Sequence, residues 1–384
     1  MLDFAFCNPT QLVFGRKALE GLGERVKKWS ERVLVVYGGG SVKRSGLLDR
    51  VHQDLTASGV WFQDLPGVQP NPVISLVRTG VEICKREKIG LILAVGGGSV
   101  IDTSKAIGLG ALYDGDPWDF FCGRQAEATV PVGVILTIPA AGSENSMDAV
   151  VTNEESGLKR ASCAGDFIRP VFSLLNPELT FTLPPYQTAC GVCDMIAHVL
   201  ERYFTLTPHV DLTDRLSEAL IVTVMENAPI VLKDPENYDA RAEIMLCGTY
   251  AHNGSLGVGR ASDWASHGMG HEISALTGAA HGATLAVIMP TWMKYVLHTD
   301  VRRFAQLAER VMGVKPQENE ERTALAGIDA FRAFLTGIGL PEKLSELGVR
   351  ESDIPLLARK CHSTGNGFRK LNEEDIAAIY RMAL

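Results

Sequence analysis

Residues 91–105 read L-I-L-A-V-G-G-G-S-V-I-D-T-S-K: a short apolar run, three glycines and then a helical pattern. The apolar run predicts a buried strand, and the helix is expected to begin at Ser99. Glycines at the carboxyl end of a strand let the backbone approach a ligand closely, and the N–H groups of the next helix can bind a phosphate. The stretch therefore predicts an α/β domain with a phosphate site, although a glycine run alone can also be a tight turn.

The surrounding sequence extends this pattern. Buried strands are also expected at 32–37, 132–139 and 170–177, and helical segments such as 76–88 lie between them. Strands that alternate with helices imply a mainly parallel sheet covered by helices on both faces.

The pattern changes at L-P-P-Y, residues 183–186. Beyond it, long amphipathic stretches such as 187–204 and 212–228 follow one another, and tandem prolines suit the start of the first helix. The sequence therefore predicts an α/β dinucleotide-binding domain over residues 1–183 and an all-helical domain over 184–384. A length of 384 residues also favours two domains.

Composition argues against several classes of function. A net charge of −8 disfavours nucleic-acid and anionic-membrane partners. No apolar run reaches the ~20 residues of a membrane span, and the start M-L-D-F-A-F-C-N-P-T lacks the features of a secretory signal. Eight scattered cysteines argue against a disulfide scaffold. We expect a soluble, cytoplasmic protein.

A second glycine run, Y-G-G-G-S at 37–41, follows another expected strand. Neither run fits G-x-G-x-x-G, so the standard dinucleotide fingerprint is absent. Two such runs at strand ends still favour a dinucleotide site, in which Gly97, Gly98 and Ser99 cradle a pyrophosphate. Asp102 is expected to meet a ribose or the nicotinamide end of the cofactor, unless it only complements the helix dipole.

The first glycine run also bears on the choice of cofactor. NAD sites usually carry an Asp or Glu at the end of the second strand, where the carboxylate binds the adenosine 2′-OH. Here that position is Gly38, and the cations Lys43 and Arg44 follow it closely. Such a loop suits a 2′-phosphate, which favours NADP(H).

Three of the nine histidines, His267, His271 and His281, lie close together in the second half of the chain. His267 and His271 share a helical face because they are four residues apart, and so do Asp194 and His198. One carboxylate with imidazoles from three places makes a plausible cage for Fe(II), Zn(II), Mn(II) or Co(II). The same histidines could instead be packed, hydrogen-bonded core residues.

Eight motifs then follow in order: Y-G-G-G-S-V-K (37–43), P-N-P (70–72), A-V-G-G-G-S-V-I-D-T-S-K (94–105), L-T-I-P-A-A-G-S-E (136–144), T-L-P-P (182–185), G-V-C-D-M-I-A-H-V-L-E (191–201), D-W-A-S-H-G-M-G-H-E (263–272) and H-G-A-T-L-A (281–286). In kind and order they resemble the group III, or iron-containing, alcohol dehydrogenases over nearly the whole chain. Within that family the chain is most similar to the NADPH-dependent butanol dehydrogenase and broad-range aldehyde reductase branch.

The resemblance implies a dehydroquinate synthase-like fold and hydride transfer between NADP(H) and a small aldehyde or primary alcohol. A divalent metal, Fe2+ or Zn2+ before others, would polarise the carbonyl. By position, the family's metal ligands match Asp194, His198, His267 and His281, and His271 matches a histidine near the substrate that does not bind the metal. We take His271 as the candidate proton donor.

The resemblance also implies the cofactor contacts. Positions that match the family's dinucleotide site are Asn71, Gly97, Gly98, Ser99, Asp102, Thr137 and Lys159, and those that match the 2′-phosphate loop are Gly38, Gly39, Ser41 and Lys43. One departure is Ala141, where many members keep a threonine that can hydrogen-bond near the nicotinamide. Whether Ser143 replaces that contact is open.

Several alternatives remain. The first is another enzyme on the same fold, either an NAD-linked polyol dehydrogenase of the glycerol dehydrogenase kind or a dehydroquinate-synthase-like lyase. The second is a metal- or nucleotide-binding homologue without turnover. Because the family often forms dimers, we also expect a homodimer, with residues 1–15 supplying a strand pair at the interface.

Overall fold

The computed structural model describes residues 1–361 and 367–384. The chain forms two compact units: one is Cys7–Thr182, and the other combines Met1–Phe6 with Leu183–Leu384. The boundary near residue 183 is where the strand pattern stops in the sequence, but the first six residues go with the second unit. None of the helices in the described residues combines the length and apolar character that a membrane span requires.

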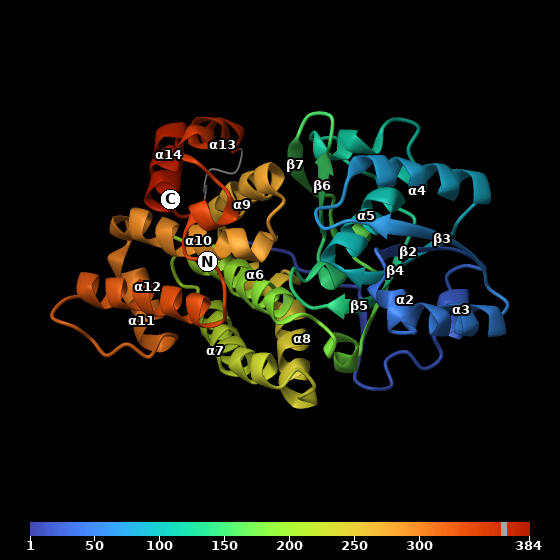
Figure 1. Ribbon diagram of the computed structural model, residues 1–384, viewed down its shortest axis with the longest axis horizontal. Coiled ribbons are helices and arrows are strands. Elements are labelled where there is room, and N and C mark those ends of the chain that lie inside the picture. The colour runs from blue at the N-terminus through green and yellow to red at the C-terminus, as the bar shows by residue number, and fades with distance from the viewer. Residues whose placement is uncertain (362–366) are drawn as a thin grey trace. The chain divides into compact units, whose positions relative to one another are not determined.

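The first unit is built on a six-stranded, wholly parallel sheet in the order β1-β8-β5-β4-β2-β3 (Figure 1). The strands are β1 (Gln11–Phe14), β2 (Arg32–Gly38), β3 (Trp61–Val68), β4 (Leu91–Gly97), β5 (Val132–Ile138) and β8 (Phe172–Leu175). The helices are α1 (Leu22–Lys27), α2 (Ser41–Arg44), α3 (Leu47–Ala57), α4 (Ile74–Glu87) and α5 (Gly98–Ala111). A separate antiparallel hairpin joins β6 (Asp148–Asn153) to β7 (Leu158–Cys163).

Helices cover this sheet on both faces. Alternate residues of β2, Val33 and Val35, pack with α1 and α3 in one apolar cluster. On the opposite side α4 packs against α5 (Figure 1). Every residue of β4 is buried, as expected for a central strand of a parallel sheet. The predicted fold class is confirmed. The sequence patterns missed β3 and the hairpin, whereas β1 falls within residues 1–15, where the sequence predicts strand structure.

Strand β4 lies between β5 and β2, so the loops after β2 and β4 leave the same edge of the sheet side by side. This arrangement follows from parallel pairing, because all carboxyl ends then point one way. Within residues 1–15, only Gln11–Phe14 form a strand, and it pairs with β8 of its own sheet.

The second unit is helical, and its described residues contain no strand. Its helices are α6 (Pro185–Tyr203), α7 (Asp211–Lys233), α8 (Tyr238–His252), α9 (Ala265–Thr277), α10 (His281–Val296), α11 (Val301–Arg310), α12 (Glu320–Gly337), α13 (Ile354–Lys360) and α14 (Glu373–Met382). Helix α6 runs through the middle of the core, since every residue from Thr188 to Tyr203 is buried. Pro185 is its first residue, as the tandem prolines predict.

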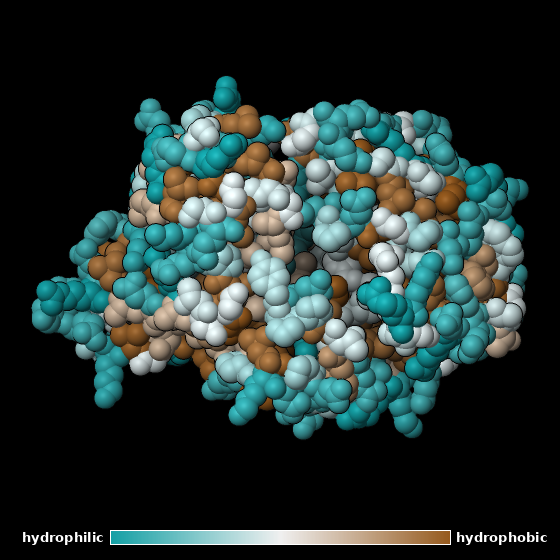
Figure 2. All heavy atoms as spheres, in the orientation of Figure 1, coloured by the Kyte–Doolittle hydropathy of each residue, from teal (hydrophilic) through white to brown (hydrophobic). Residues whose placement is uncertain are grey.

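On the face of the molecule shown in the space-filling view, apolar side chains are interspersed with polar ones (Figure 2). Scattered apolar residues of this kind are normal for a folded protein.

A buried ionic network ties α7 to α11 and to the segment before α9. The Asp214 carboxylate accepts hydrogen bonds from Arg260 at 2.8 Å, from Arg303 and from Gln306. The Arg260 side chain is fully buried. Burial raises the pKa of the Asp214 carboxyl, but hydrogen bonds and charge from Arg303 and Arg260 outweigh it and hold this pKa below its ordinary value.

Replacing Asp214 tests this network. Asp214→Asn leaves two guanidinium groups without their countercharge, so we expect a loss of roughly 3–5 kcal/mol in unfolding free energy at neutral pH. The folded-state pKa is depressed, so the stabilisation is present above the pKa of an unfolded aspartate, about 3.9, and is lost as pH falls through the folded value. Urea unfolding across this pH range measures both effects. Asp329→Asn, which removes an exposed partner of Lys294, is the control and should cost about 1 kcal/mol or less; equal losses in the two variants would contradict the prediction.

Candidate functional site

The two glycines that end β4, Gly96 and Gly97, are required by packing. A Cβ at Gly96 would lie 2.4 Å from the Val100 side chain, and one at Gly97 would lie 2.8 Å from Ile138. Helix α5 begins at Gly98, so the predicted residues Gly97, Gly98 and Ser99 stand at its N-terminus. The N–H groups of a first helical turn have no partner inside the helix, which makes this end suitable for a phosphate.

Asp102 has both of its carboxylate oxygens engaged within the unit. It accepts from the Ser143 hydroxyl at 2.6 Å and from the Val150 backbone N–H at 3.0 Å. It therefore holds the loop before β6 against α5, in addition to any contact with a cofactor. The Ser143 hydroxyl already donates its proton to Asp102. It therefore cannot also donate to a cofactor in place of the threonine that many family members have at the position of Ala141.

Lys105, one turn after Asp102, is a feature that the sequence patterns did not single out as functional. Its side chain is fully buried and donates to the Ser143 hydroxyl, to the carbonyl and hydroxyl of Ser146 and to the Asp148 carbonyl, at 2.8–3.2 Å. Burial lowers the pKa of this ammonium to about 8, and the Asp102 charge opposes the shift. Asp102 and Lys105 together fasten the loop at 143–148 to the glycine-run helix.

Two other predicted cofactor residues meet directly. The Lys159 ammonium, on β7, donates to the Asn71 side-chain carbonyl at 2.8 Å, although the two lie far apart in sequence. Asn71 has a φ of 59°, in the left-handed region that asparagine tolerates. Thr137 is partly buried near the end of β5, and Ile138 next to it pairs with Gly97.

The loop after β2 carries the predicted 2′-phosphate residues. Gly38 ends β2, Gly39 and Gly40 follow, and Ser41 and Lys43 lie in the single turn of α2. The Lys43 ammonium lies 5.2 Å from the centre of the Tyr37 ring.

A carboxylate of the neighbouring strand contacts Tyr37, the residue directly before Gly38. Asp64 of β3 accepts a hydrogen bond from the Tyr37 hydroxyl at 3.2 Å and lies 3.0 Å from the His52 imidazole. No sequence pattern indicated Asp64, because the pairing that brings β3 beside β2 is decided by the tertiary structure.

In the helical unit, Asp194, His267 and His281 each offer a ligand atom, and these atoms all lie within 4.8 Å of one another. Asp194 comes from the buried middle of α6, His267 from the first turn of α9, and His281 is the first residue of α10. Asp194 Oδ1 and His267 Nε2 are 3.7 Å apart, and neither atom has a hydrogen-bond partner within the described part of the chain. A carboxylate and two imidazoles that converge in this way fit a divalent metal.

His198 lies beside this group, one turn along α6 from Asp194. Its ring is 4.4 Å from that of His267, and its Nδ1 is 2.8 Å from the Asp194 backbone carbonyl. That contact leaves Nε2 as the nitrogen for a metal. Burial, with smaller contributions from neighbouring histidines and Arg202, lowers the pKa of His198 well below its usual value.

His271 is set apart from the three converging ligands. It lies one turn after His267, with ring centres 6.4 Å apart, and its ring centre is 4.7 Å from that of His281. Its side chain is partly exposed, unlike that of His267.

Four residues around the histidines were not predicted from the sequence. They are Glu201, Arg202, His252 and Trp264, whose side chains contact His198 or His267. Arg202 donates to His252 Nδ1 at 3.0 Å, which places the imidazole proton of His252 on Nε2. Glu201 lies seven residues after Asp194, a spacing that returns to the same helical face and could have pointed to it.

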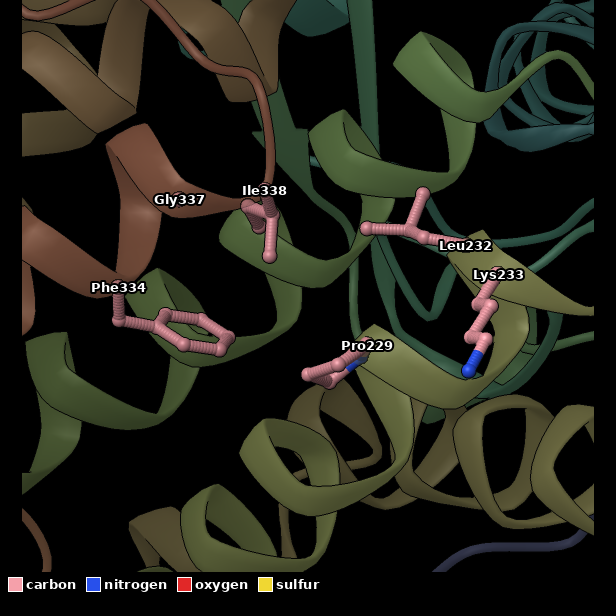
Figure 3. Close-up of a pocket in the computed structure, with 6 residues that line it drawn as sticks. All are labelled: Pro229, Leu232, Lys233, Phe334, Gly337 and Ile338. Atoms are coloured by element: carbon pink, nitrogen blue, oxygen red, sulfur yellow. The ribbon is translucent and has the colours of Figure 1, made fainter.

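A separate hollow of about 460 Å³ lies on the helical unit, between the ends of α7 and α12 (Figure 3). Its lining residues are Pro229, Leu232, Lys233, Phe334, Gly337 and Ile338. Lys233 is the one charged side chain among these six, and none of them is a predicted site residue.

Comparisons with known proteins match nearly the whole chain to one family. A family model described as iron-containing alcohol dehydrogenase matches residues 9–177, and one described as Fe-containing alcohol dehydrogenase family, C-terminal, matches residues 188–384.

Individual relatives agree with the family models. The chain is 42% identical to the probable NADH-dependent butanol dehydrogenase 1 of Bacillus subtilis (strain 168), over 100% of both chains. It is 38% identical to the NADPH-dependent aldehyde reductase YqhD of Escherichia coli (strain K12), over 95% of this chain and 94% of the relative. The crystal structure of NADH-dependent butanol dehydrogenase A from Thermotoga maritima superposes with a TM-score of 0.94 at 37% identity, over 100% of this chain and 99% of the other. The chain therefore belongs to the iron-containing alcohol dehydrogenase family of oxidoreductases.

Proposed function

We propose that this chain is a metal-dependent, NADP(H)-linked alcohol dehydrogenase that acts mainly as a reductase of small aldehydes. The observation that carries the proposal is the pair of buried atoms Asp194 Oδ1 and His267 Nε2, which lie 3.7 Å apart beside His281. Each buried polar atom without a partner costs about 1–3 kcal/mol, and a cation bound between them removes that cost. The names of the relatives, butanol dehydrogenases and an aldehyde reductase, support small aldehydes and primary alcohols as substrates.

The proposed ligands are Asp194, His198, His267 and His281. One carboxylate and three imidazoles without a thiolate suit Fe2+ or Zn2+. When bound, such an ion acts as a Lewis acid toward a carbonyl oxygen, a contribution of several kcal/mol.

His271 is proposed to supply the proton. Bound NADP(H) would supply a hydride for the carbonyl carbon, so reduction to the alcohol also needs a proton at the oxygen. A partly exposed imidazole one turn from His267 can exchange protons with water and deliver one at neutral pH.

The NADP(H) assignment depends on the loop from Gly38 to Lys43. Glycines there leave room for a 2′-phosphate, and Lys43 adds a cation. Asp64 is the opposing observation, because a carboxylate close to this loop favours a free 2′-OH. The relatives are named for either cofactor, NADH for the butanol dehydrogenase and NADPH for the aldehyde reductase.

A homodimer in the cytoplasm completes the proposal. Strand β1 is at one edge of the sheet, and its Leu12 and Phe14 side chains are exposed. An edge strand with open backbone groups and apolar side chains favours pairing with a second copy.

The positions of the proposed metal ligands depend on a close approach of α10 to α6. A Cβ at Gly282 would lie 2.0 Å from the Cys190 carbonyl oxygen, so only glycine allows this helix spacing. Gly282 directly follows His281, and Cys190 is one turn before Asp194 on α6. The contact thus sets the distance between two of the proposed ligands.

Turnover should require metal and prefer NADPH. Metal-stripped protein given back Fe2+ or Zn2+ is expected to oxidise NADPH in the presence of butyraldehyde, followed by the absorbance of the reduced nicotinamide. Lys43→Ala should lower kcat/KM for NADPH roughly tenfold, the loss of one charge-assisted contact, and leave the NADH value unchanged. A preference for NADH would refute the NADP(H) assignment, and NADPH binding without turnover under any metal would favour the non-catalytic alternative.

Removing His271 should separate proton delivery from metal binding. His271→Ala is expected to lower kcat by roughly 10²-fold or more while the bound metal, measured by elemental analysis, stays at the wild-type level. His267→Ala is the contrasting variant and should lose the metal itself. Loss of metal from His271→Ala would show that His271 is a ligand and contradict its assigned role.

Adding one methyl group at Gly282 should weaken the metal site. Gly282→Ala forces α10 away from α6 and so displaces His281. We expect zinc affinity to fall roughly tenfold or more, the loss that is typical when a residue supporting a metal ligand is changed. Gly337→Ala, where a Cβ meets nothing within 4 Å, is the matched control and should keep zinc affinity unchanged. Competition with a chelator measures both, and an unaffected Gly282→Ala would rule out the spacing argument.

A further inference from the structure

Glu201 is a buried carboxylate to which the family motifs assign no role. It lies on α6, two turns after Asp194, and its exposed fraction is 0%. A carboxylate at such a depth is costly unless every lone pair is used.

The side-chain hydrogen bonds of Glu201 all go to the start of α9. Oε1 accepts from the His267 backbone N–H at 2.9 Å and from His267 Nδ1 at 3.0 Å. Oε2 accepts from the Trp264 backbone N–H at 2.9 Å. One carboxylate therefore serves both as the N-terminal cap of α9 and as the partner of a proposed metal ligand.

The Trp264 contact holds an unusual backbone. Trp264 has a φ of 72°, a left-handed conformation that costs a bulky residue free energy of order 1–3 kcal/mol. It directly precedes α9 and turns the chain so that His267 enters the core facing Asp194. The hydrogen bond to Glu201 keeps this turn in place.

The His267 contact decides which ring nitrogen is available. A carboxylate only accepts hydrogen bonds, so the imidazole proton must be on Nδ1. Nε2 then carries the lone pair, and it is Nε2 that lies 3.7 Å from Asp194 Oδ1 in the ligand cluster.

We propose that Glu201 is the positioning residue of the metal centre: it selects the Nδ1–H tautomer of His267 and clamps the first turn of α9, so that Nε2 is presented to the metal. This inference rests on the proposed metal site. Partners of this kind, which orient a metal-ligating histidine, typically change metal affinity by 10–100-fold when removed.

Glu201→Gln is the decisive variant, with Co2+ as the probe. The amide has one acceptor oxygen in place of two, so it cannot receive both the Trp264 and His267 donors. Titration of the metal-stripped protein, followed by the visible absorption of bound Co2+, should show a dissociation constant roughly 10–100-fold above wild type, with an altered spectrum.

Glu218→Gln is the matched control. Glu218 is also a buried glutamate of the helical unit, but it bonds Tyr203, Gln306 and Arg310 rather than a proposed ligand. It should lower the melting temperature and leave Co2+ affinity within roughly threefold of wild type, far less than the loss of an orienting partner. Equal losses of affinity in both variants, or none in Glu201→Gln, would overturn the proposal for Glu201.

A second measurement uses the unaltered protein and so does not depend on whether the variant folds. In the zinc-loaded chain labelled with 15N-histidine, His267 should bind zinc through Nε2 and retain the proton on Nδ1, with its signals assigned from their loss in His267→Gln. Zinc bound through Nδ1 would refute the role of Glu201. If the wild-type protein binds neither Co2+ nor zinc, the proposed metal site itself fails, which is a distinct result.

Discussion

The candidate metal site depends on one constraint: α6 is buried along sixteen consecutive residues, Thr188 to Tyr203, and yet carries Asp194, His198 and Glu201. A polar group in such a core must be hydrogen-bonded, paired or bound to a metal. Glu201 uses its lone pairs on the start of α9, whereas Asp194 Oδ1 faces His267 Nε2 without a bond to it. Because α6 is buried, its carboxylates and its imidazole are held in place in the core, and this is the basis of the proposed metal site.

The α/β unit uses a different device. Parallel pairing brings the loops after β2 and β4 to one sheet edge, and packing against Ile138 and Val100 keeps the second loop rich in glycine. Behind that loop, the buried Lys105 ammonium joins Asp102, Ser143 and the segment up to Asp148 into one network. Fixed hydrogen bonds of this kind hold the glycine run, the proposed phosphate site, rigid before any ligand arrives.

Much of the fold could be predicted from local sequence patterns. The structure has a strand at the apolar run 91–95 and starts a helix at the glycines that follow it. It begins the first long helix of the second unit at the prolines at 184 and 185. Strand β3 and the hairpin were not predicted, because partly exposed strands carry little apolar periodicity. The motif resemblance, confirmed by the family models, added residue roles that periodicity alone left open.

The sequence by itself determined the parallel α/β unit, the helical unit and the residue types that could hold a phosphate or a metal, since propensity and periodicity act over a few turns of chain. Tertiary structure alone decided which of these groups meet: Asp64 with Tyr37, Lys159 with Asn71, and Glu201 with His267. These pairs lie on different elements, and their distances depend on strand order and helix packing rather than on any local spacing. Moving a donor about an ångström away from its acceptor breaks a hydrogen bond. Which side chains bond to one another is therefore decided only when the core has packed.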